Sequence, residues 1–244
     1  MKVSIVIPVL NSHEILRRQM LHFEKMDLSD TEIIIVDDGS EPPLKYEGKL
    51  PVTIQYTNDK RPWTWALARN AGARIASGEY LLMFDIDHIV TQELINAVKT
   101  FGGQKMQFRR EFGVLLEDGV LTQDLDTLVK YGFPIERYKN RRLTISPLPN
   151  NFAMRRDVFF ALGGYLEDRV ERPYPQGEDR LFKKAWHEWV RAGKGDVHNE
   201  RSIIYMFPNG KVCGDVDFNP FGLFHKLSRA NRNNYWYRKQ RGGK

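Results

Sequence analysis

The chain has 244 residues, of which 41% are hydrophobic and 28% are charged. This composition is typical of a folded globular protein with one large domain and excludes wholesale disorder. No apolar run approaches the roughly 20 residues of a membrane-spanning helix, and the single cysteine, Cys213, excludes an internal disulfide. We therefore expect a protein of a reducing compartment, located in the cytoplasm.

The net charge of +6 is concentrated at the carboxyl end of the chain. Residues 226–244 contain seven Lys and Arg and no acid, so the other 225 residues sum to −1. Two interpretations of this basic tail remain open. It is either a solvated terminal helix or a contact with an anionic partner, membrane phospholipid or nucleic acid.

Strand and helix patterns alternate through the first hundred residues. The apolar segment 3–10 is too short for a bilayer and lacks a signal-peptide cleavage site, so it is interpreted as a first strand. The predicted strands are 2–7, 32–36, 51–56 and 80–84. The first predicted helix follows Ser12, which can cap it. The next two helices span 63–75 and run from a Thr91 cap to about residue 101. This alternation predicts an α/β fold with a mostly parallel sheet covered by helices on both faces.

The regular alternation is lost between residues 109 and 149, a charged segment interrupted by prolines. We interpret this segment as an insertion that shapes a substrate pocket. Beyond it the sequence predicts a strand over 151–154, helices over 157–162 and 178–192, a strand over 202–207 and a last helix over 224–237.

Two aspartates, Asp85 and Asp87, directly follow the apolar strand predicted over 80–84. In open α/β sheets, ligands bind at the carboxyl ends of the strands, and carboxylates there suit a hard divalent cation that carries phosphate. The same spacing recurs at 124–126 and 215–217, but without such a strand before it. Those two pairs are therefore interpreted as surface or loop acids.

Glycine-rich phosphate loops are missing from the sequence. The turn after the first strand, residues 8–12, contains no glycine, and no GxxxxGK[ST] motif occurs. Backbone amides at the first helix are thus not expected to hold a phosphate. A metal ion bound by Asp85 and Asp87 could hold the phosphate instead.

Four segments, in this order and spacing, resemble the family 2 glycosyltransferases of the GT-A fold. They are VSIVIPVLN at 3–11, IIIVDDGS at 33–40, ARNAG at 68–72 and FDID at 84–87. The resemblance resumes at 151–156, 162–165 and 177–179. It implies a GT-A type fold, a Rossmann-like and mostly parallel sheet flanked by helices, to which the sequence adds a C-terminal helical extension.

The resemblance also implies a nucleotide site at the ends of the first strands. Pro8 and Val9 would line the base pocket through backbone atoms, and Asp38 would accept a hydrogen bond from the N–H of a uracil-like base. Arg69 would steady a strand-end loop or the diphosphate. From the residues alone, segment 37–40 is an ordinary turn and Arg69 a surface partner of Glu79.

A metal site is implied at the aspartate pair. Asp85 would contact the ribose or the metal, and Asp87 would bind Mn²⁺ or Mg²⁺. For a third ligand, His225 is the first candidate and His198 the second. His88 is expected to point away from Asp87, because side chains alternate along an extended chain, and to have a supporting or structural role.

The reacting end is placed at Glu178 and Asp179, which begin a predicted helix. Their ordinary interpretation is as first-turn acids that interact favourably with the helix dipole. The resemblance implies instead that Asp179 is the general base and that Glu178 orients the acceptor.

The leading hypothesis is a metal-dependent inverting glycosyltransferase with a nucleotide-diphosphate sugar donor, expected to be a UDP-sugar. The acceptor would be a glycan or a lipid-linked saccharide, with the tail on the inner membrane face. One alternative acceptor is nucleic acid, such as hydroxymethylated bases of viral DNA, because aromatic and basic residues interleave over 231–241. A catalytically silent nucleotide-sugar-binding module is the alternative from another class.

The expected organisation is a single domain over 1–220 followed by the basic tail at 221–244. Within the domain, the nucleotide-binding half would span about 1–108 and the acceptor half about 109–220.

Overall fold

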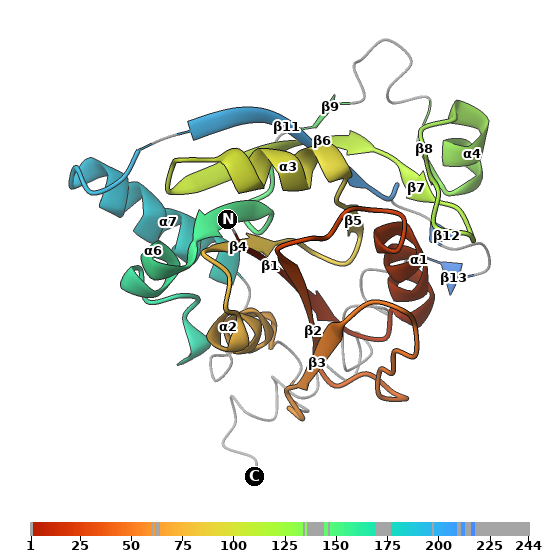
Figure 1. The fold of residues 1–244 in the computed structure, drawn as a ribbon, viewed down its shortest axis with the longest axis horizontal. Coiled ribbons are helices and arrows are strands. Elements are labelled where there is room, and N and C mark those ends of the chain that lie inside the picture. Colours follow the sequence, from red (N-terminus) through yellow and green to blue (C-terminus); the bar gives the residue numbers. More distant parts are fainter. Residues whose placement is uncertain are drawn as a thin grey trace, which may run out of the picture.

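The computed structural model describes residues 2–59, 61, 64–133, 135, 144–145, 147–168, 177–196, 198–208, 211–212 and 216–217. Within these ranges a sheet of nine strands crosses the molecule in the order β3-β2-β1-β4-β10-β6-β11-β5, and β9 pairs with β6 (Figure 1). The strands of this sheet are β1 (Val3–Val9), β2 (Thr31–Asp37), β3 (Val52–Tyr56), β4 (Tyr80–Met83), β5 (His88–Ile89), β6 (Lys105–Phe112), β9 (Thr144–Ile145), β10 (Phe152–Arg155) and β11 (His198–Met206). Small separate pairs are formed by β7 (Val114–Leu115) with β8 (Leu121–Thr122), and by β12 (Lys211–Val212) with β13 (Val216–Asp217).

The strand directions divide the sheet into two parts. The first four strands in space, β3, β2, β1 and β4, are all parallel. Strand β10 then runs antiparallel between β4 and β6, and β11 lies parallel to β6. The carboxyl ends of β1, β2 and β4 therefore meet at one edge, where the chain can place ligand-binding side chains.

Helices cover both faces of the sheet (Figure 1). They are α1 (His13–Phe23), α2 (Trp65–Ile75), α3 (Gln92–Thr100), α4 (Leu125–Lys130), α6 (Arg156–Ala161) and α7 (Glu178–Arg191). Apolar residues of α1 and α3 pack in one core cluster, and those of α2, α6 and α7 pack in a second cluster on the other face. The predicted α/β architecture with two covered faces is confirmed.

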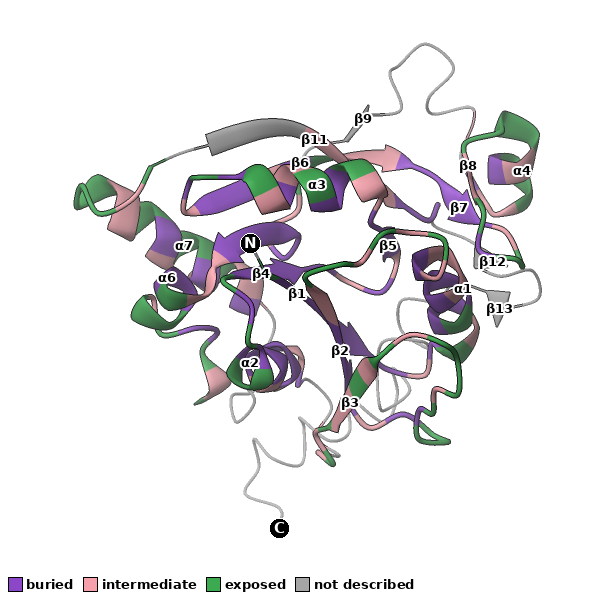
Figure 2. Cartoon of the chain, in the orientation of Figure 1, coloured by how far each residue is buried: buried purple, intermediate pink, exposed green. Residues whose placement is uncertain are grey.

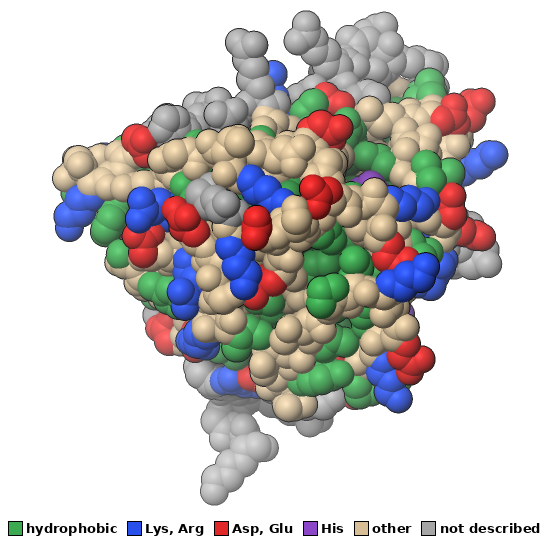
Figure 3. All heavy atoms as spheres, in the orientation of Figure 1, with side chains coloured by type: hydrophobic (Ala, Val, Ile, Leu, Met, Phe, Trp, Pro, Cys, Tyr) green, Lys and Arg blue, Asp and Glu red, His purple; other side chains and the backbone are tan. Residues whose placement is uncertain are grey.

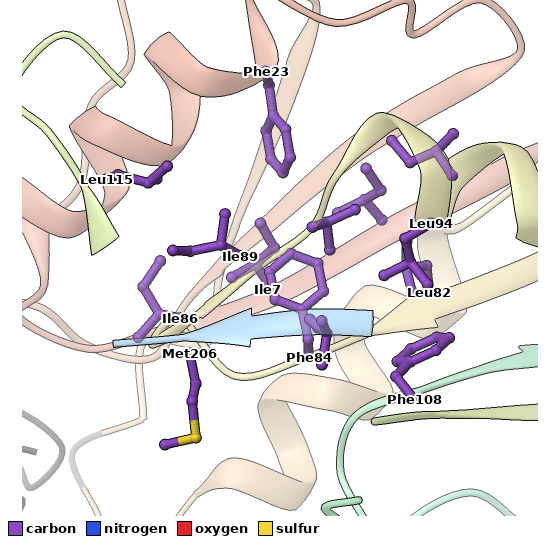
Figure 4. Packing of buried hydrophobic residues seen from close by; sticks show 14 of the residues in the cluster. Ile7, Phe23, Leu82, Phe84, Ile86, Ile89, Leu94, Phe108, Leu115 and Met206 are labelled. Carbon is purple, nitrogen blue, oxygen red and sulfur yellow. The ribbon is translucent and has the colours of Figure 1, made fainter. Parts of the chain in front are cut away.

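The central strands are buried on both faces, as Figure 2 shows for β1, β2 and β4. Such strands consist of continuous apolar runs, because each side chain meets a helix layer on one face or the other. Figure 4 shows the first cluster, where Ile7 and Leu82 of the sheet lie near Phe84, with Phe23 of α1 and Leu94 of α3 packed against them.

Local chemistry fixes the helix starts in two different ways. The Thr91 hydroxyl accepts a hydrogen bond from the backbone N–H of Leu94, as predicted for the cap of α3. Ser12 occupies the cap position of α1 but makes no such bond, because its hydroxyl donates to the Leu10 carbonyl at 2.9 Å. The capping role predicted for Ser12 is therefore wrong.

The segment predicted to be an irregular insertion contributes a central strand. Strand β6 (Lys105–Phe112) enters this segment and lies between β10 and β11, and β7, β8 and α4 follow it. Residues 136–143 lie outside the described residues, as does the helix predicted over 224–237.

None of the described helices combines the length and the apolar character that a bilayer span requires. On the face drawn in Figure 3, acidic and basic side chains are interspersed among polar and apolar ones.

Candidate active site

The predicted donor-site residues gather at the edge formed by the carboxyl ends of β1, β2 and β4. Pro8 and Val9 end β1, Asp38 follows β2, and Asp85 follows β4 within two residues. The backbone N–H of Asp38 donates to the Val9 carbonyl at 2.9 Å, so the first two strand ends are joined directly.

A compact group of potential metal ligands lies beyond β4. Ligand atoms of Asp85, Asp87 and His88 lie within 4.8 Å of one another. His88 Nδ1 is 2.7 Å from Asp87 Oδ1, and the histidine is 1% exposed. Burial disfavours the charged form of the Asp87 carboxyl, but His88, a backbone hydrogen bond and Arg110 together outweigh this effect and lower the pKa of Asp87 below its ordinary value.

The orientation predicted for His88 is wrong, because its ring contacts Asp87 instead of pointing away. The chain turns at this point: the N–H of His88 donates to the Asp85 carbonyl at 2.9 Å. Side chains alternate only along an extended strand, so the rule does not apply across this turn. A supporting role for His88 agrees with its contact to Asp87.

Arg69 links the aspartate pair to the start of α7. It projects from α2, forms an ion pair with Asp85, and places Nη1 3.7 Å from Glu178 Oε1. Its side chain is 3% exposed, and its guanidinium lies 5.4 Å from the centre of the Tyr165 ring. Burial opposes the charge, but Asp85 and Glu178 together raise the pKa of Arg69 above its ordinary value. The alternative surface pairing with Glu79 is not what the structure contains.

The two acids at the start of α7 differ in their surroundings. Helix α7 begins after Gly177, whose φ of 90° is a left-handed conformation that favours glycine. Glu178 is 8% exposed, and burial raises the pKa of its carboxyl even though Arg69 acts in the opposite direction. Asp179 is half-buried. Glu178 is thus held against Arg69, and Asp179 is the more accessible acid.

Asp38 is buried and bonded on both carboxylate oxygens. The hydroxyl of Thr57 donates to Oδ1 at 3.0 Å and that of Thr64 donates to Oδ2 at 2.6 Å. The preceding Asp37 stabilises the turn, since its Oδ1 accepts from the backbone N–H of Ser40 at 2.8 Å. The base contact of Asp38 stays a prediction.

The model of the family described as glycosyl transferase family 2 matches residues 4–160, which is more than half of the chain. The chain belongs to glycosyl transferase family 2. The matched range contains the strand ends, Arg69 and the Asp85–Asp87 pair, and it ends before α7.

Curated relatives of this family 2 chain are longer proteins. The cholesterol galactosyltransferase of Borreliella burgdorferi is 30% identical over 105 residues, which are 40% of this chain and 28% of that protein. A poly(ribitol-phosphate) beta-glucosyltransferase of Bacillus spizizenii is 36% identical over 106 residues, 39% of this chain and 16% of the relative. The chain thus matches less than a third of the length of either relative.

Solved structures share the fold at low identity. TarS 1–349 of S. aureus, in complex with UDP-GlcNAc, superposes with a TM-score of 0.56 at 16% identity over 99% of this chain and 73% of that one. The mannosyltransferase PcManGT of Pyrobaculum calidifontis, with GDP-Man and Mn²⁺, gives a TM-score of 0.50 at 17% identity over 84% and 56% of the two chains. These likenesses confirm the GT-A fold.

Three asparagines around the family 2 site were not identified from the sequence as site residues. Asn70 accepts from the N–H of Tyr165 at 3.0 Å and donates to its carbonyl at 2.8 Å, which fastens this loop to α2. Asn150 Oδ1 accepts from the Tyr165 hydroxyl at 3.1 Å. Asn151 Oδ1 accepts from the N–H of Asp85 at 3.1 Å. Asn70 lies within the ARNAG segment, and the other two asparagines lie just before β10. Their position in or beside the family motifs is the sequence feature that could have identified them.

Several predicted site features lie outside what the structure describes. His225 and the basic tail at 226–244 are outside the described residues, and the side chain of His198 is also undescribed. The third-ligand prediction and the partner predicted for the tail therefore stay predictions.

Proposed function

We propose that this family 2 chain is a metal-dependent, inverting glycosyltransferase that uses a nucleotide-diphosphate sugar. The observation that carries the proposal is the junction of Asp85 and Asp87 with Glu178 through Arg69. It brings the start of α7, which carries the candidate base Asp179 directly after Glu178, beside a candidate cation site. In the same proposal, residues 1–108 and 109–220 are the nucleotide-binding and acceptor halves of a single domain, and residues 221–244 are a separate tail.

The chemistry of the donor set fits a hard divalent cation. Two carboxylates and one imidazole offer ligand atoms within 4.8 Å, and carboxylate oxygen is the ligand that Mn²⁺ and Mg²⁺ prefer. Asp87 would hold the ion, with Asp85 as a second ligand or a ribose contact and His225 as a third ligand. When bound, the cation would stabilise the charge that develops on the leaving nucleoside diphosphate. The PcManGT complex with GDP-Man and Mn²⁺, and the TarS complex with UDP-GlcNAc, support metal use and a UDP-linked donor.

The chain's own residues have distinct roles in the proposal. Asp87 contacts His88 Nδ1 at 2.7 Å, and Asp85 forms an ion pair with Arg69. Asp179, the accessible acid at the start of α7, would remove the proton from the acceptor hydroxyl. Attack from the side opposite to the leaving group inverts the anomeric carbon. Glu178, held by Arg69, would orient the acceptor.

The acceptor class is proposed to be a hydroxyl on a glycan or a lipid-linked saccharide. The names of two relatives, a poly(ribitol-phosphate) beta-glucosyltransferase and a cholesterol galactosyltransferase, indicate a polymeric glycan and a lipid as acceptors in those proteins. The seven positive charges of the tail would attract anionic lipid at the inner membrane face.

A panel of nucleotide sugars tests the proposal. UDP-glucose, UDP-galactose, UDP-GlcNAc and GDP-mannose are added with and without Mn²⁺, and the melting temperature and donor hydrolysis are measured. The proposal predicts a rise in melting temperature with a UDP-sugar and Mn²⁺ together. Asp179→Asn should bind that donor as the wild type does but lose at least about 100-fold in turnover. Undiminished turnover in Asp179→Asn would rule out Asp179 as the general base. Donor binding that is unaffected by Mn²⁺ would rule out the proposed metal dependence.

A further inference from the structure

Asn151 stands out among the buried polar residues near the aspartate pair. It directly precedes β10, it is 1% exposed, and its Oδ1 accepts from the backbone N–H of Asp85 at 3.1 Å. An N–H donor requires an acceptor opposite it, so this contact fixes which end of the carboxamide is oxygen and which is nitrogen. The Nδ2 group must therefore face away from that N–H.

The Nδ2 group of Asn151 is buried and has no hydrogen-bond partner within the described part of the chain. Buried donors without a partner are rare in native proteins, because their desolvation is not compensated. The neighbouring Asn150 differs, since its Oδ1 accepts from the Tyr165 hydroxyl and its side chain is not among those with a buried unpaired atom. Of these two adjacent asparagines, only the one that contacts the backbone of Asp85 therefore has a buried donor without a partner.

We propose that Asn151 is a binding residue whose Nδ2 donates a hydrogen bond to an oxygen of the nucleotide sugar. The inference rests on the proposed function, since it assigns a further residue to the same site. Asp85 and Asp87 offer only acceptors when ionised, and a nucleotide sugar carries phosphate and hydroxyl oxygens that need donors. A neutral amide supplies such a donor without competing for the cation.

The two sources of that oxygen, diphosphate and sugar, are distinguished by the ligand. If Nδ2 contacts the diphosphate, loss of the amide should weaken the binding of UDP and of UDP-GlcNAc equally. If Nδ2 contacts the sugar, only the binding of UDP-GlcNAc should be weakened. In either case one lost hydrogen bond to a ligand should lower affinity by about 10-fold or more.

Asn151→Asp is the informative variant, because it keeps an oxygen for the N–H of Asp85 and replaces the NH₂ donor by an acceptor. Asn150→Asp is the matched control, one residue away, buried, and bringing the same added charge. Affinity is measured by calorimetry with Mn²⁺ and either UDP or UDP-GlcNAc. We expect a loss of about 10-fold or more for Asn151→Asp and less than about threefold for Asn150→Asp. Equal losses in both variants would overturn the assignment.

A measurement on the unaltered chain covers the case in which the variant does not fold. The side-chain NH₂ resonances of ¹⁵N-labelled asparagine are followed while UDP-GlcNAc and Mn²⁺ are added. The proposal predicts that the Asn151 pair shifts on binding and that the Asn150 pair shifts less. Binding that leaves the Asn151 resonances unmoved overturns the inference and leaves the proposed function intact. If no nucleotide sugar of the panel binds, the proposed function itself is ruled out.

Discussion

Lys105 provides a sharp test of the packing between β6 and α7. This lysine is 2% exposed, and its Nζ has no hydrogen-bond partner within the described residues. Aromatic rings surround it, with centres 4.9 Å (Phe152), 5.5 Å (Phe182) and 5.4 Å (Trp186) from Nζ. Burial, together with the charge of Lys183, lowers the pKa of Lys105 to about 7. We predict that Lys105→Met stabilises the protein at neutral pH and removes a pH dependence.

The magnitude follows from the two protonation equilibria. A pKa of about 7 in the folded state, against 10.5 in the unfolded chain, corresponds to a destabilisation of at most about 5 kcal/mol at pH 7 and below. Between these values the unfolded chain binds the proton and the folded chain does not. The free energy of unfolding of the wild type should therefore rise with pH by up to about 1.4 kcal/mol per pH unit. This rise is absent below pH 7, where both states bind the proton.

The assay is urea unfolding of the wild type and of Lys105→Met at half-unit steps from pH 6.5 to 9.5. Subtracting the two curves cancels groups that titrate equally in both proteins. Lys184→Met is the matched control, because the Lys184 side chain is 71% exposed on the same helix as two of the three rings. The advantage of Lys105→Met over the wild type should shrink steadily above pH 7, while Lys184→Met parallels the wild type. An advantage that stays constant across this range would refute the account of Lys105.

Two further predictions concern the helices that position the site. Thr91→Ala should lower the free energy of unfolding by about 1 kcal/mol, because it removes the cap bond of α3. In urea unfolding Ser12→Ala should lose less, since Ser12 makes no cap bond, and an equal loss would contradict this difference. Gly72→Ala should destabilise by about 1–3 kcal/mol, because its Cβ would come within 2.4 Å of a Val6 methyl and push α2 off the sheet. Gly102→Ala is the control, because nothing lies within 4 Å of the Cβ that it would add. Equal melting temperatures for Gly72→Ala and this control would show that α2 can move without cost and would contradict the prediction.

The sequence predicts the parallel half of the fold well, because β1, β2 and β4 are mostly apolar runs between turn residues, and β3 is a short β-branched and aromatic segment with the same kind of bounds. Strand β1 and strand β4 begin and end within a few residues of their predicted bounds. Strand β6 is different: it carries Lys105, Arg109 and Arg110, and its place between β10 and β11 depends on pairing with distant segments. Polar residues in a central strand conceal it from a prediction based on periodicity.

Those parts of the candidate site that depend on neighbouring residues in the sequence are predictable, and those that depend on packing between distant elements are not. Asp85 is found from the strand before it, since strand ends meet at one edge. The ion pair between Arg69 and Asp85, with Glu178 nearby, joins elements far apart in sequence and follows only from the packing of α2 and α7 on one face. The orientation of His88 depends on a single turn, which sequence alternation does not represent.

The most direct test of the central claim is a Mn²⁺ titration in the presence of UDP, followed by electron paramagnetic resonance of the free ion. The wild type, Asp87→Ala and Asp126→Ala are compared, the last as a control acid from the same aspartate spacing at the start of α4. The account predicts that Asp87→Ala weakens Mn²⁺ binding by about 10-fold or more, as expected for loss of a ligand, and that Asp126→Ala binds as the wild type does. Equal affinity of Asp87→Ala and the wild type for Mn²⁺ would contradict a metal site at the Asp85–Asp87 pair.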